Sequence, residues 1–392
     1  MLHDLAARYE TFKEETLYDR FFTAGDLAAL LGREPFSPLK TVYGYSAENR
    51  PVHLLRIGAG PVHVLMWSQM HGDEPTATAA LFDLLNWLRA EETGGKDILQ
   101  KCTIHMLPML NPDGTQSFDR RNAQKIDINR DFRSAISPEA QLLKKLHSEI
   151  KPDFCFNLHD MESLWSAGNS TEPTCMAFLA PPYNRKREVN WTREQAMRVI
   201  GCIHDDLQEF IPGRIARWGD QFEERAFGDN FQKSGSPTIL IESGSWRGDP
   251  EKQQVRKYTF LSIVSALHAI ATGKYQQKEL LSYAMIPENS RNLYHLIIRS
   301  AGAIVNGHRI TADFGINFLE TYDREKKQGE KRWFLSEIGD LSGFGAYEEI
   351  NGEGLAVELG SGPDEPVNLI MLRHGHFIGS FESGRRRNRD AK

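Results

Sequence analysis

The sequence has no long apolar run. Nowhere in its 392 residues does an uninterrupted hydrophobic stretch reach the roughly 18 residues that suggest a transmembrane helix. Residues 1–22 are charged and amphipathic, and they lack the continuous apolar centre of a signal peptide. We therefore expect a cytoplasmic protein that makes no contact with a membrane.

Cysteine is scarce. The chain has 4 cysteines, and none of them belongs to a Cys-x-x-Cys pair. This number is too small for a disulfide framework, and the spacing gives no thiolate metal site. The cysteines are Cys102, Cys155, Cys175 and Cys202. We expect them to be buried, reduced thiols, as free cysteines in globular proteins usually are.

An excess of basic residues is also absent. Lys and Arg number 47 and Asp and Glu 53, which gives a formal net charge of -6. A mildly acidic chain is a poor candidate for general nucleic-acid binding, so we expect no nucleic-acid partner. The tail at residues 385–392 is basic, and we expect it to be disordered.

The composition is that of a globular protein. Hydrophobic residues make up 40% of the chain and charged residues 26%, which is enough for buried cores in two or three domains. Changes in the pattern of helix-like and strand-like stretches along the chain predict four parts. These are an N-terminal helical segment at 1–39, a larger region at 40–287, a small β domain at 288–384 and the basic tail at 385–392. The sequence indicates no particular oligomeric state.

The larger region alternates strand-like and helix-like stretches. Apolar runs of strand length occupy 61–70, 102–110 and 153–160, and helical patterns occupy 76–89 and 137–150. Such alternation predicts an α/β fold with a mixed, mostly parallel sheet and helices on both faces. Short strand-like pieces after residue 288 predict the small all-β domain.

Local signals predict further elements. Near the N-terminus, helical patterns occupy about 4–20 and 24–31. The Asn-Pro-Asp-Gly sequence at 111–114 predicts a turn that closes a strand. The Asn306-Gly307 pair predicts a two-residue hairpin turn within the β domain.

Polar residues stand where predicted strands end. His71 and Glu74 follow one apolar strand, and His159 ends another. Imidazole and carboxylate groups are suitable zinc ligands, and three protein ligands leave the fourth position open, as in catalytic zinc sites. Because ligands bind beyond the carboxyl ends of strands in open α/β sheets, we expect these side chains to share one edge. Glu242, at the end of a further strand, is the candidate general base.

The segment between these points carries a more specific pattern. Residues 111–132 read NPDGTQSFDRRNAQKIDINRDF. Together with the HGDE motif at 71–74, His159 and Glu242, this segment resembles the zinc carboxypeptidase (M14, funnelin) family, whose motifs run in the same order. The resemblance covers roughly residues 40–275. It implies a zinc carboxypeptidase-like catalytic domain that holds one zinc ion per chain, with the ligands and the general base just named.

The resemblance also implies roles for residues within this segment. Arg120 matches the arginine that polarises the scissile carbonyl, with its neighbour Arg121 as an open alternative. Asn129 and Arg130 match the pair that holds the terminal carboxylate of the substrate. Asp127 matches the carboxylate that orients the first zinc-ligating histidine. These roles are physically reasonable, because a guanidinium group binds a carboxylate through two parallel hydrogen bonds.

The match departs from the family at two places. Many digestive members carry a mobile tyrosine before the general base, but residues 184–257 contain none, which leaves Trp218 or Phe222 to cap the pocket. The residue that selects the substrate side chain also stays open. Arg225 would favour acidic side chains, whereas Asp229 would favour basic ones or the amine of diaminopimelate.

Three functions remain in competition. The first is a zinc-dependent metallocarboxypeptidase, a hydrolase that removes the C-terminal residue of a peptide with Glu242 as general base. The second is a zinc amidohydrolase that acts on cell-wall peptides or small N-acyl amino acids, like murein peptide amidases and desuccinylase- or aspartoacylase-like enzymes. The third is a non-catalytic binding protein on a hydrolase scaffold. For the two enzymes, the expected partner is a peptide or acyl-amino-acid substrate with a free carboxylate.

Overall fold

The chain folds into two compact units. The computed structural model describes residues 1–90, 93–305, 307–323, 328–360, 362, 365–374 and 376–388. Unit 1 comprises Met1–Ser163 and Thr174–Asn289, and unit 2 comprises Leu164–Pro173 and Ser290–Lys392. Unit 2 therefore takes in a short segment from the middle of the chain in addition to the C-terminal region.

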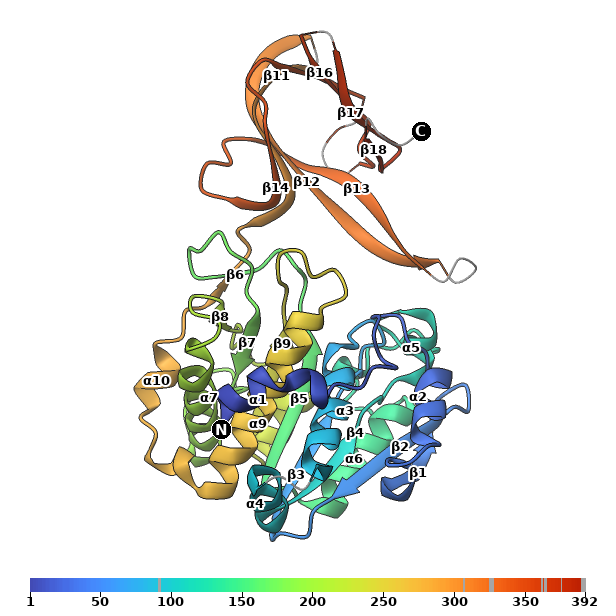
Figure 1. Cartoon of the computed structure of the whole chain (residues 1–392), viewed down its shortest axis with the longest axis vertical. Coiled ribbons are helices and arrows are strands. Elements are labelled where there is room, and N and C mark those ends of the chain that lie inside the picture. The colour runs from blue at the N-terminus through green and yellow to red at the C-terminus, as the bar shows by residue number, and fades with distance from the viewer. Residues whose placement is uncertain are drawn as a thin grey trace. The chain divides into compact units, whose positions relative to one another are not determined.

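Unit 1 is built around an eight-stranded sheet (Figure 1). In order across the sheet the strands are β1 (Lys40–Tyr45), β2 (Pro51–Ile57), β4 (Cys102–Leu107), β3 (Val62–Trp67), β5 (Phe154–Asp160), β9 (Thr238–Ser243), β7 (Met176–Leu179) and β8 (Ile215–Arg217). The central strands β4, β3, β5 and β9 run parallel, whereas β2 and β7 pair antiparallel with β4 and β9. The predicted α/β class with a mixed sheet is confirmed.

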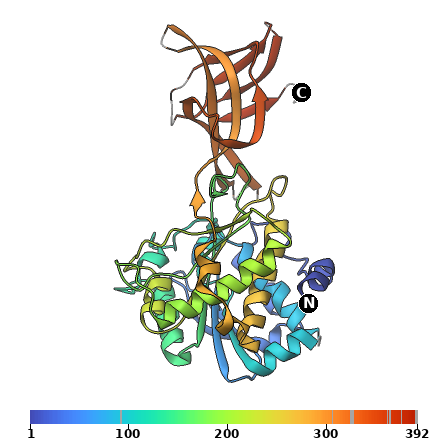
Figure 2. The same cartoon turned by 90° about the vertical axis from the view of Figure 1, so that its left-hand side faces the viewer.

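Helices cover both faces of this sheet (Figures 1 and 2). The α-helices are α1 (Leu2–Ala7), α2 (Ala24–Leu31), α3 (Thr76–Arg89), α4 (Thr93–Lys101), α5 (Pro112–Ser117), α6 (Pro138–Ile150), α7 (Trp191–Gln208), α8 (Phe227–Lys233), α9 (Gln253–Thr272) and α10 (Leu280–Ala284). Short 3-10 helices are η1 (Tyr9–Thr11), η2 (Ser37–Leu39), η3 (Ile128–Arg130) and η4 (Lys274–Gln277). None of the described helices is long and apolar enough to cross a lipid bilayer.

Each face of the sheet has its own core. Val64 and Met66 of β3 pack with α3, α7 and α9, whereas Leu65 and Trp67 pack with α6 and α8. This division follows from strand geometry, because successive side chains point to opposite faces. All four cysteines are buried and free, as predicted.

The first predicted helix is wrong. The helix expected over 4–20 ends at Ala7 as α1, and only the short η1 follows. Beyond it the backbone bonds to distant side chains: Glu14 N donates to Asp83 at 2.7 Å, and Arg256 donates to Glu14 O at 2.9 Å. These tertiary hydrogen bonds outweigh the local helix propensity of the segment.

The predicted turn at 111–114 opens a helix, α5. Asn111 Oδ1 accepts a hydrogen bond from Gly114 N at 2.9 Å, and Pro112 occupies the first turn. Asparagine as the cap and proline directly after it are favoured at helix starts. The same residue types favour tight turns, so the sequence alone did not distinguish the two.

Unit 2 consists of strands around a separate core, which confirms the predicted small β domain. Its strands are β6 (Ser166–Ala167), β10 (Asn289–Ser290, which begins at the last residue of unit 1), β11 (Leu293–Val305), β12 (His308–Asp323), β13 (Gln328–Gly339), β14 (Gly345–Asn351), β15 (Leu355–Leu359), β16 (Leu369–Arg373), β17 (His376–Glu382) and β18 (Arg385–Asn388). The main sheet has the order β13-β12-β11-β15-β16-β17-β18, with β14 also paired to β11. Asn306, in the predicted hairpin turn, lies outside the described residues, but β11 and β12 on either side pair antiparallel.

β18 corrects the prediction of a disordered tail from residue 385. Its residues pair antiparallel with β17. The Arg386 guanidinium donates two hydrogen bonds of 2.5 Å to Glu348, and Arg387 Nη2 lies 2.6 Å from Glu382. Carboxylates on other strands thus compensate the basic charge, and composition alone does not reveal them. Residues 389–392 lie outside the described part of the chain.

A buried ion pair anchors the N-terminal segment to unit 1. Arg256 on α9 and Asp83 on α3 have side chains that are 1% and 0% exposed. Arg256 donates to Asp83 through Nε at 2.8 Å and Nη2 at 2.5 Å, and Tyr9 Oη donates to the same carboxylate at 2.7 Å. Removal of one partner from a buried pair leaves the other charge uncompensated.

We predict that Arg256→Met lowers the free energy of unfolding of unit 1 by about 3–5 kcal/mol, because Asp83 would stay buried without its counter-charge. Urea denaturation followed by far-ultraviolet circular dichroism measures this loss. Arg8→Met is the control, because Arg8 and its partner Asp4 are exposed, and exposed pairs contribute little. A loss no larger than that of the control would contradict the prediction.

Candidate metal and active site

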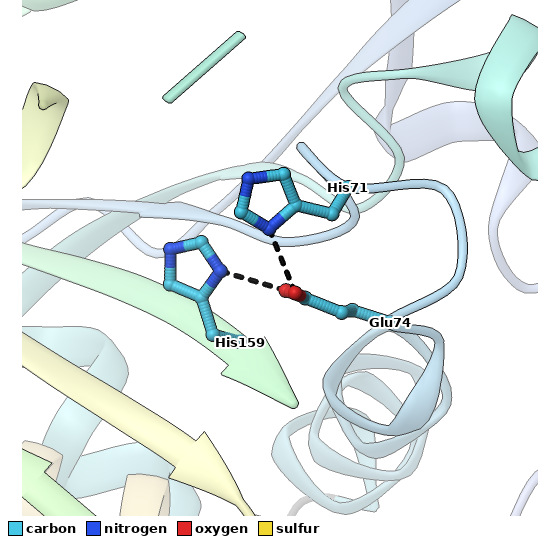
Figure 3. Close-up of side chains that lie close together, drawn as sticks. All are labelled: His71, Glu74 and His159. Carbon is cyan, nitrogen blue, oxygen red and sulfur yellow. Dashed lines mark hydrogen bonds and ion pairs between the residues drawn. The ribbon is translucent and has the colours of Figure 1, made fainter. Parts of the chain in front are cut away.

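The three predicted metal ligands converge in unit 1. Glu74 Oε1 lies 2.7 Å from His71 Nδ1, and Glu74 Oε2 lies 2.7 Å from His159 Nδ1 (Figure 3). One potential ligand atom from each residue lies within 4.8 Å of the others, and all three residues are buried. Within the described part of the chain, this is the only such group of three or more metal-binding side chains.

Neighbouring parallel strands bring these residues together. β3 and β5 are adjacent; His71 and Glu74 lie in the connection from β3 to α3, and His159 lies in β5. β9 is the other neighbour of β5, and its Glu242 is the register partner of His159. All four side chains therefore come from the carboxyl edge of the sheet, where ligands bind in α/β folds.

Gly72 links the two sequence motifs. A Cβ atom at Gly72 would lie 2.0 Å from the backbone carbon of Gly114, so only glycine fits at this crossing. Gly72 N also donates to Asp119 O at 3.0 Å. The HGDE loop is thereby held directly against the segment that follows β4.

The three residues carry strongly shifted pKa values. Burial opposes ionisation of Glu74, but the charges of His71 and His159 outweigh burial and hold the pKa of Glu74 far below its usual range. Burial likewise opposes the charge of His71, but Glu74 and Asp127 raise the pKa of His71 to about 9. Burial lowers the pKa of His159. The cluster places one ionised carboxylate and two histidine rings in one buried place, and this donor set fits zinc once His71 has given up its proton.

Asp127 and Arg120 flank the first histidine. Asp127 Oδ1 lies 3.2 Å from His71 Nε2, the ring nitrogen that does not face Glu74. Arg120 donates through Nε to Asp127 at 3.1 Å and through Nη1 to Glu74 at 3.3 Å. Arg121 instead donates to Lys125 O and does not join the cluster. Of the two candidate arginines, Arg120 is the one that lies beside the ligands.

Asn129 lies beside the second histidine, and Arg130 follows it in the chain. Asn129 Nδ2 lies 3.4 Å from His159 Nε2, and its Oδ1 accepts from Phe227 N at 3.1 Å. Arg130 donates to Asn129 O at 2.9 Å, and its Nε lies 3.3 Å from Glu223 Oε2. The Arg130 side chain is 39% exposed, so its guanidinium group is accessible to a ligand.

Glu242 differs from Glu74 in its preferred protonation state. It is only 8% exposed. Burial and then the charge of Glu74 raise the pKa of Glu242 well above its usual range. The edge of the sheet therefore holds one carboxylate that favours ionisation and one that favours its proton.

The two open candidates for side-chain selection differ in exposure. Arg225 is exposed and donates to Glu223 through Nε at 2.9 Å and Nη2 at 2.8 Å. Asp229 is 8% exposed, and its Oδ1 accepts from Glu223 N at 2.9 Å. Burial raises the pKa of Asp229 to about 7. Asp229 therefore stabilises the loop before α8 through its hydrogen bond with Glu223 N, whereas Arg225 faces solvent.

The sequence did not single out Lys252. Its ammonium group lies 3.2 Å from Asp160 Oδ2, 3.4 Å from Met161 O and 3.3 Å from Ser243 O. Asp160 Oδ2 also accepts from the Thr76 hydroxyl at 2.5 Å. Asp160 directly follows His159 in the sequence, but no local pattern connects it to a lysine 92 residues later.

Lys252 therefore joins the three segments that carry the site. Thr76, Asp160 and Ser243 follow closely after Glu74, His159 and Glu242 respectively. The lysine itself adopts a left-handed backbone conformation with φ of 51° directly before α9. A non-glycine residue in this region carries some strain, which the three polar contacts offset.

The fold of unit 1 is that of metallocarboxypeptidases. A metallo-carboxypeptidase from Burkholderia cenocepacia superimposes with a TM-score of 0.53 at 18% identity, over 66% of this chain and 71% of the other. Carboxypeptidase A from Helicoverpa armigera gives a TM-score of 0.51 at 18% identity, over 64% of this chain and 74% of the other.

Sequence comparison confirms the resemblance to zinc carboxypeptidases of family M14. Residues 28–167 match the family model described as zinc carboxypeptidase. A probable carboxypeptidase 2 from Arthroderma benhamiae is 30% identical over 204 residues, which is 51% of this chain and 35% of that protein. Carboxypeptidase SOL1 from Arabidopsis thaliana is 36% identical over 72 residues, which is 18% of this chain and 15% of that protein. The matched part thus spans about a third or less of the length of these curated relatives.

We predict that Lys252→Met lowers the free energy of unfolding by about 3–5 kcal/mol, because Asp160 would stay buried without a cation. The double variant Asp160→Asn/Lys252→Met should recover part of this loss, since it removes both charges. Chemical denaturation of the two single variants, the double variant and the wild type gives the coupling energy. Additive losses would show that the two side chains do not act as a pair.

Proposed function

We propose that the protein is a zinc-dependent carboxypeptidase that hydrolyses the C-terminal amide bond of a peptide with a free terminal carboxylate. The observation that carries this proposal is the buried His71–Glu74–His159 cluster with Glu242 beside it on the next strand. Arg120 and Arg130 add two cationic side chains next to that cluster. The carboxypeptidase names of the curated relatives point to the same reaction class.

The donor set suits one zinc ion per chain, with His71, Glu74 and His159 as its ligands. Three protein ligands of this kind are typical of catalytic rather than structural zinc sites. When bound, zinc makes water a stronger acid and a carbonyl carbon more electrophilic. Asp127, on the far nitrogen of His71, keeps that ring in one orientation, as carboxylates commonly do for metal-binding histidines.

Glu242 is the group that we assign to proton transfer. The positive charge of a bound zinc ion would favour the ionised form of Glu242, whose carboxylate would then take a proton from the attacking water and pass it to the nitrogen of the departing residue. Its place opposite His159 in the register of two parallel strands keeps it at the same edge as the ligands. Because Glu242 is only 8% exposed, its carboxylate contacts little bulk solvent that could compete with that water.

Arg120 is the group that we assign to the developing negative charge. Asp127 and Glu74 already hold its guanidinium group near the first histidine. A donor that is fixed before the reaction needs no reorganisation when charge appears on the carbonyl oxygen, and loss of one such donor typically costs about 100- to 1000-fold in rate.

Arg130, together with Asn129, is assigned to the terminal carboxylate of the substrate. A guanidinium group can hold a carboxylate through two parallel hydrogen bonds, which fixes both distance and direction. Such a contact would register the last amide bond of the peptide against the reacting groups, and productive alignment lowers the barrier substantially.

A substrate screen tests the proposed reaction. Zinc-loaded protein is incubated with free-ended peptides, C-terminally amidated peptides, muropeptides and N-acyl amino acids, and products are identified by mass spectrometry. Stepwise loss of C-terminal residues supports the carboxypeptidase proposal. Cleavage confined to muropeptides or N-acyl amino acids would contradict it and favour the amidohydrolase alternative. A cytoplasmic location stays a prediction.

Variants of the ligands and of the base separate metal binding from catalysis. We predict that Glu242→Gln retains about one zinc per chain but loses at least about 100-fold in kcat, because the amide cannot accept the proton. His71→Ala or His159→Ala should instead lose zinc, because two ligands remain. Metal analysis after dialysis and steady-state kinetics measure the two properties. Near wild-type turnover of Glu242→Gln would rule out the assigned base.

The carboxylate clamp predicts a difference between substrates. Arg130→Ala should raise KM about 10- to 100-fold for a peptide with a free C-terminus, since a charge-assisted contact is lost. The same peptide with an amidated C-terminus lacks that contact and serves as the control. If the variant changed the kinetics of both peptides equally, Arg130 would not be a carboxylate clamp.

A further inference from the structure

Arginine side chains gather around the loop before α8, which is paired with Arg130 of the site through Glu223. In this loop, each of three carboxylates lies between two guanidinium groups. The arginine cluster consists of Arg130, Arg133, Arg185, Arg187, Arg193 and Arg225, and the carboxylates are Asp220, Glu223 and Glu224.

Glu223 joins the site to this cluster. Its Oε2 lies 3.3 Å from Arg130 Nε and 2.8 Å from Arg225 Nη2. A single carboxylate oxygen is therefore within reach of both guanidinium groups. Arg130 is the residue assigned to the terminal carboxylate of the substrate, and Glu223 links it to Arg225.

The other two carboxylates repeat this arrangement. Glu224 lies 3.2 Å from Arg133 Nη1 and 3.8 Å from Arg185 Nη2. Asp220 lies 3.1 Å from Arg187 and 3.0 Å from Arg193.

Six cationic groups thus share three anionic ones, although the chain as a whole has a net charge of -6. Nearby, Glu188 accepts hydrogen bonds from Asn184 and Tyr183 and adds a fourth carboxylate, which leaves six guanidinium groups against four carboxylates. The arginine cluster therefore keeps an excess of positive charge, and a group of like-signed charges attracts ligands of the opposite sign.

The cluster contacts the segment that carries Arg130, and most of its arginines are exposed, although Arg193 is only 4% exposed. Phe132 N donates to Arg225 O at 3.1 Å, and Phe227 N donates to Asn129 Oδ1 at 3.1 Å, so the backbone of this loop is bonded to the segment that carries Arg130. The Arg225 side chain is 53% exposed and that of Arg187 is 58% exposed.

We propose that the arginine cluster selects peptides whose C-terminal residue is acidic, an inference that rests on the proposed carboxypeptidase function. A terminal glutamate or aspartate carries two carboxylates a few bonds apart. Arg130 takes the terminal carboxylate, and Arg225 takes the side-chain carboxylate. The outer arginines attract the acidic chain through their field.

The alternative selector, Asp229, is poorly placed for a basic side chain. Its Oδ1 already accepts the Glu223 backbone N–H, and only 8% of the residue is exposed. A basic terminal residue would also meet the excess of guanidinium groups, and such like-charge contact disfavours binding.

Three peptides that differ only in their last residue, Glu, Gln or Lys, test the proposal. For zinc-loaded wild type we expect kcat/KM for the Glu peptide to exceed that for the Gln peptide about tenfold, and the Lys peptide to be slowest. The preference should shrink at 0.5 M salt, because exposed charges are screened. Equal or faster hydrolysis of the Gln or Lys peptide would overturn the proposal.

Charge-removing variants assign the effect to particular residues. Arg225→Gln should lower the Glu-to-Gln ratio toward one, whereas Arg185→Gln/Arg187→Gln should mainly weaken its salt dependence. Arg8→Gln is the matched control, because Arg8 is distant from the site. It lies near Trp87, at the end of α3 that is farther from Glu74. The control should keep the wild-type ratio. An Arg225→Gln variant with the wild-type ratio would overturn the role of this residue.

A binding measurement separates this proposal from the proposed reaction. Calorimetry with zinc-loaded Glu242→Gln should give about tenfold tighter binding of the Glu peptide than of the Gln peptide. Equal binding would overturn the acidic preference even if all peptides are hydrolysed. Tighter binding of the Glu peptide without hydrolysis of any peptide by wild type would support the preference and contradict the carboxypeptidase function.

Discussion

The carboxylate of Glu74, buried between two imidazoles, is the interaction on which the site depends. Each of its oxygens lies 2.7 Å from one histidine, so neither ring can move without loss of a charge-assisted hydrogen bond. A buried carboxylate without such partners would be costly. The arrangement exists because β3 and β5 are adjacent and parallel, which makes the chain leave both strands at the same edge. Glu242 reaches that edge through β9 in the same way.

Much of this could be predicted from the sequence, because the relevant signals are local. The apolar runs that precede His71, His159 and Glu242 identify strands, and the helices between them require parallel pairing. Parallel pairing in turn brings the strand ends to one edge. Helix α3 was predicted to the residue, since its leucines recur at helical spacing. The mixed sheet and the small β domain follow from the same patterns.

The remainder depends on contacts between distant parts of the chain. Lys252 contacts Asp160 because the end of β5 and the start of α9 lie close together in the fold, so no local sequence pattern predicts the pair. The choice between Arg120 and Arg121 also requires the folded loop, because the two are neighbours with equal chemistry. The N-terminal segment did not form its predicted helix because two of its backbone carbonyl groups accept hydrogen bonds from Arg256. In each case a tertiary hydrogen bond overrides or completes a local preference.

X-ray absorption spectroscopy at the zinc edge tests the central claim most directly, that one buried cluster of two imidazoles and a carboxylate holds a zinc ion. After zinc loading and dialysis, we expect one zinc per chain, with only nitrogen and oxygen ligands at about 2.0–2.2 Å and imidazole scattering from two histidines. Sulfur at about 2.3 Å, or a chain that retains no zinc, would contradict the assignment of His71, Glu74 and His159 as the metal ligands.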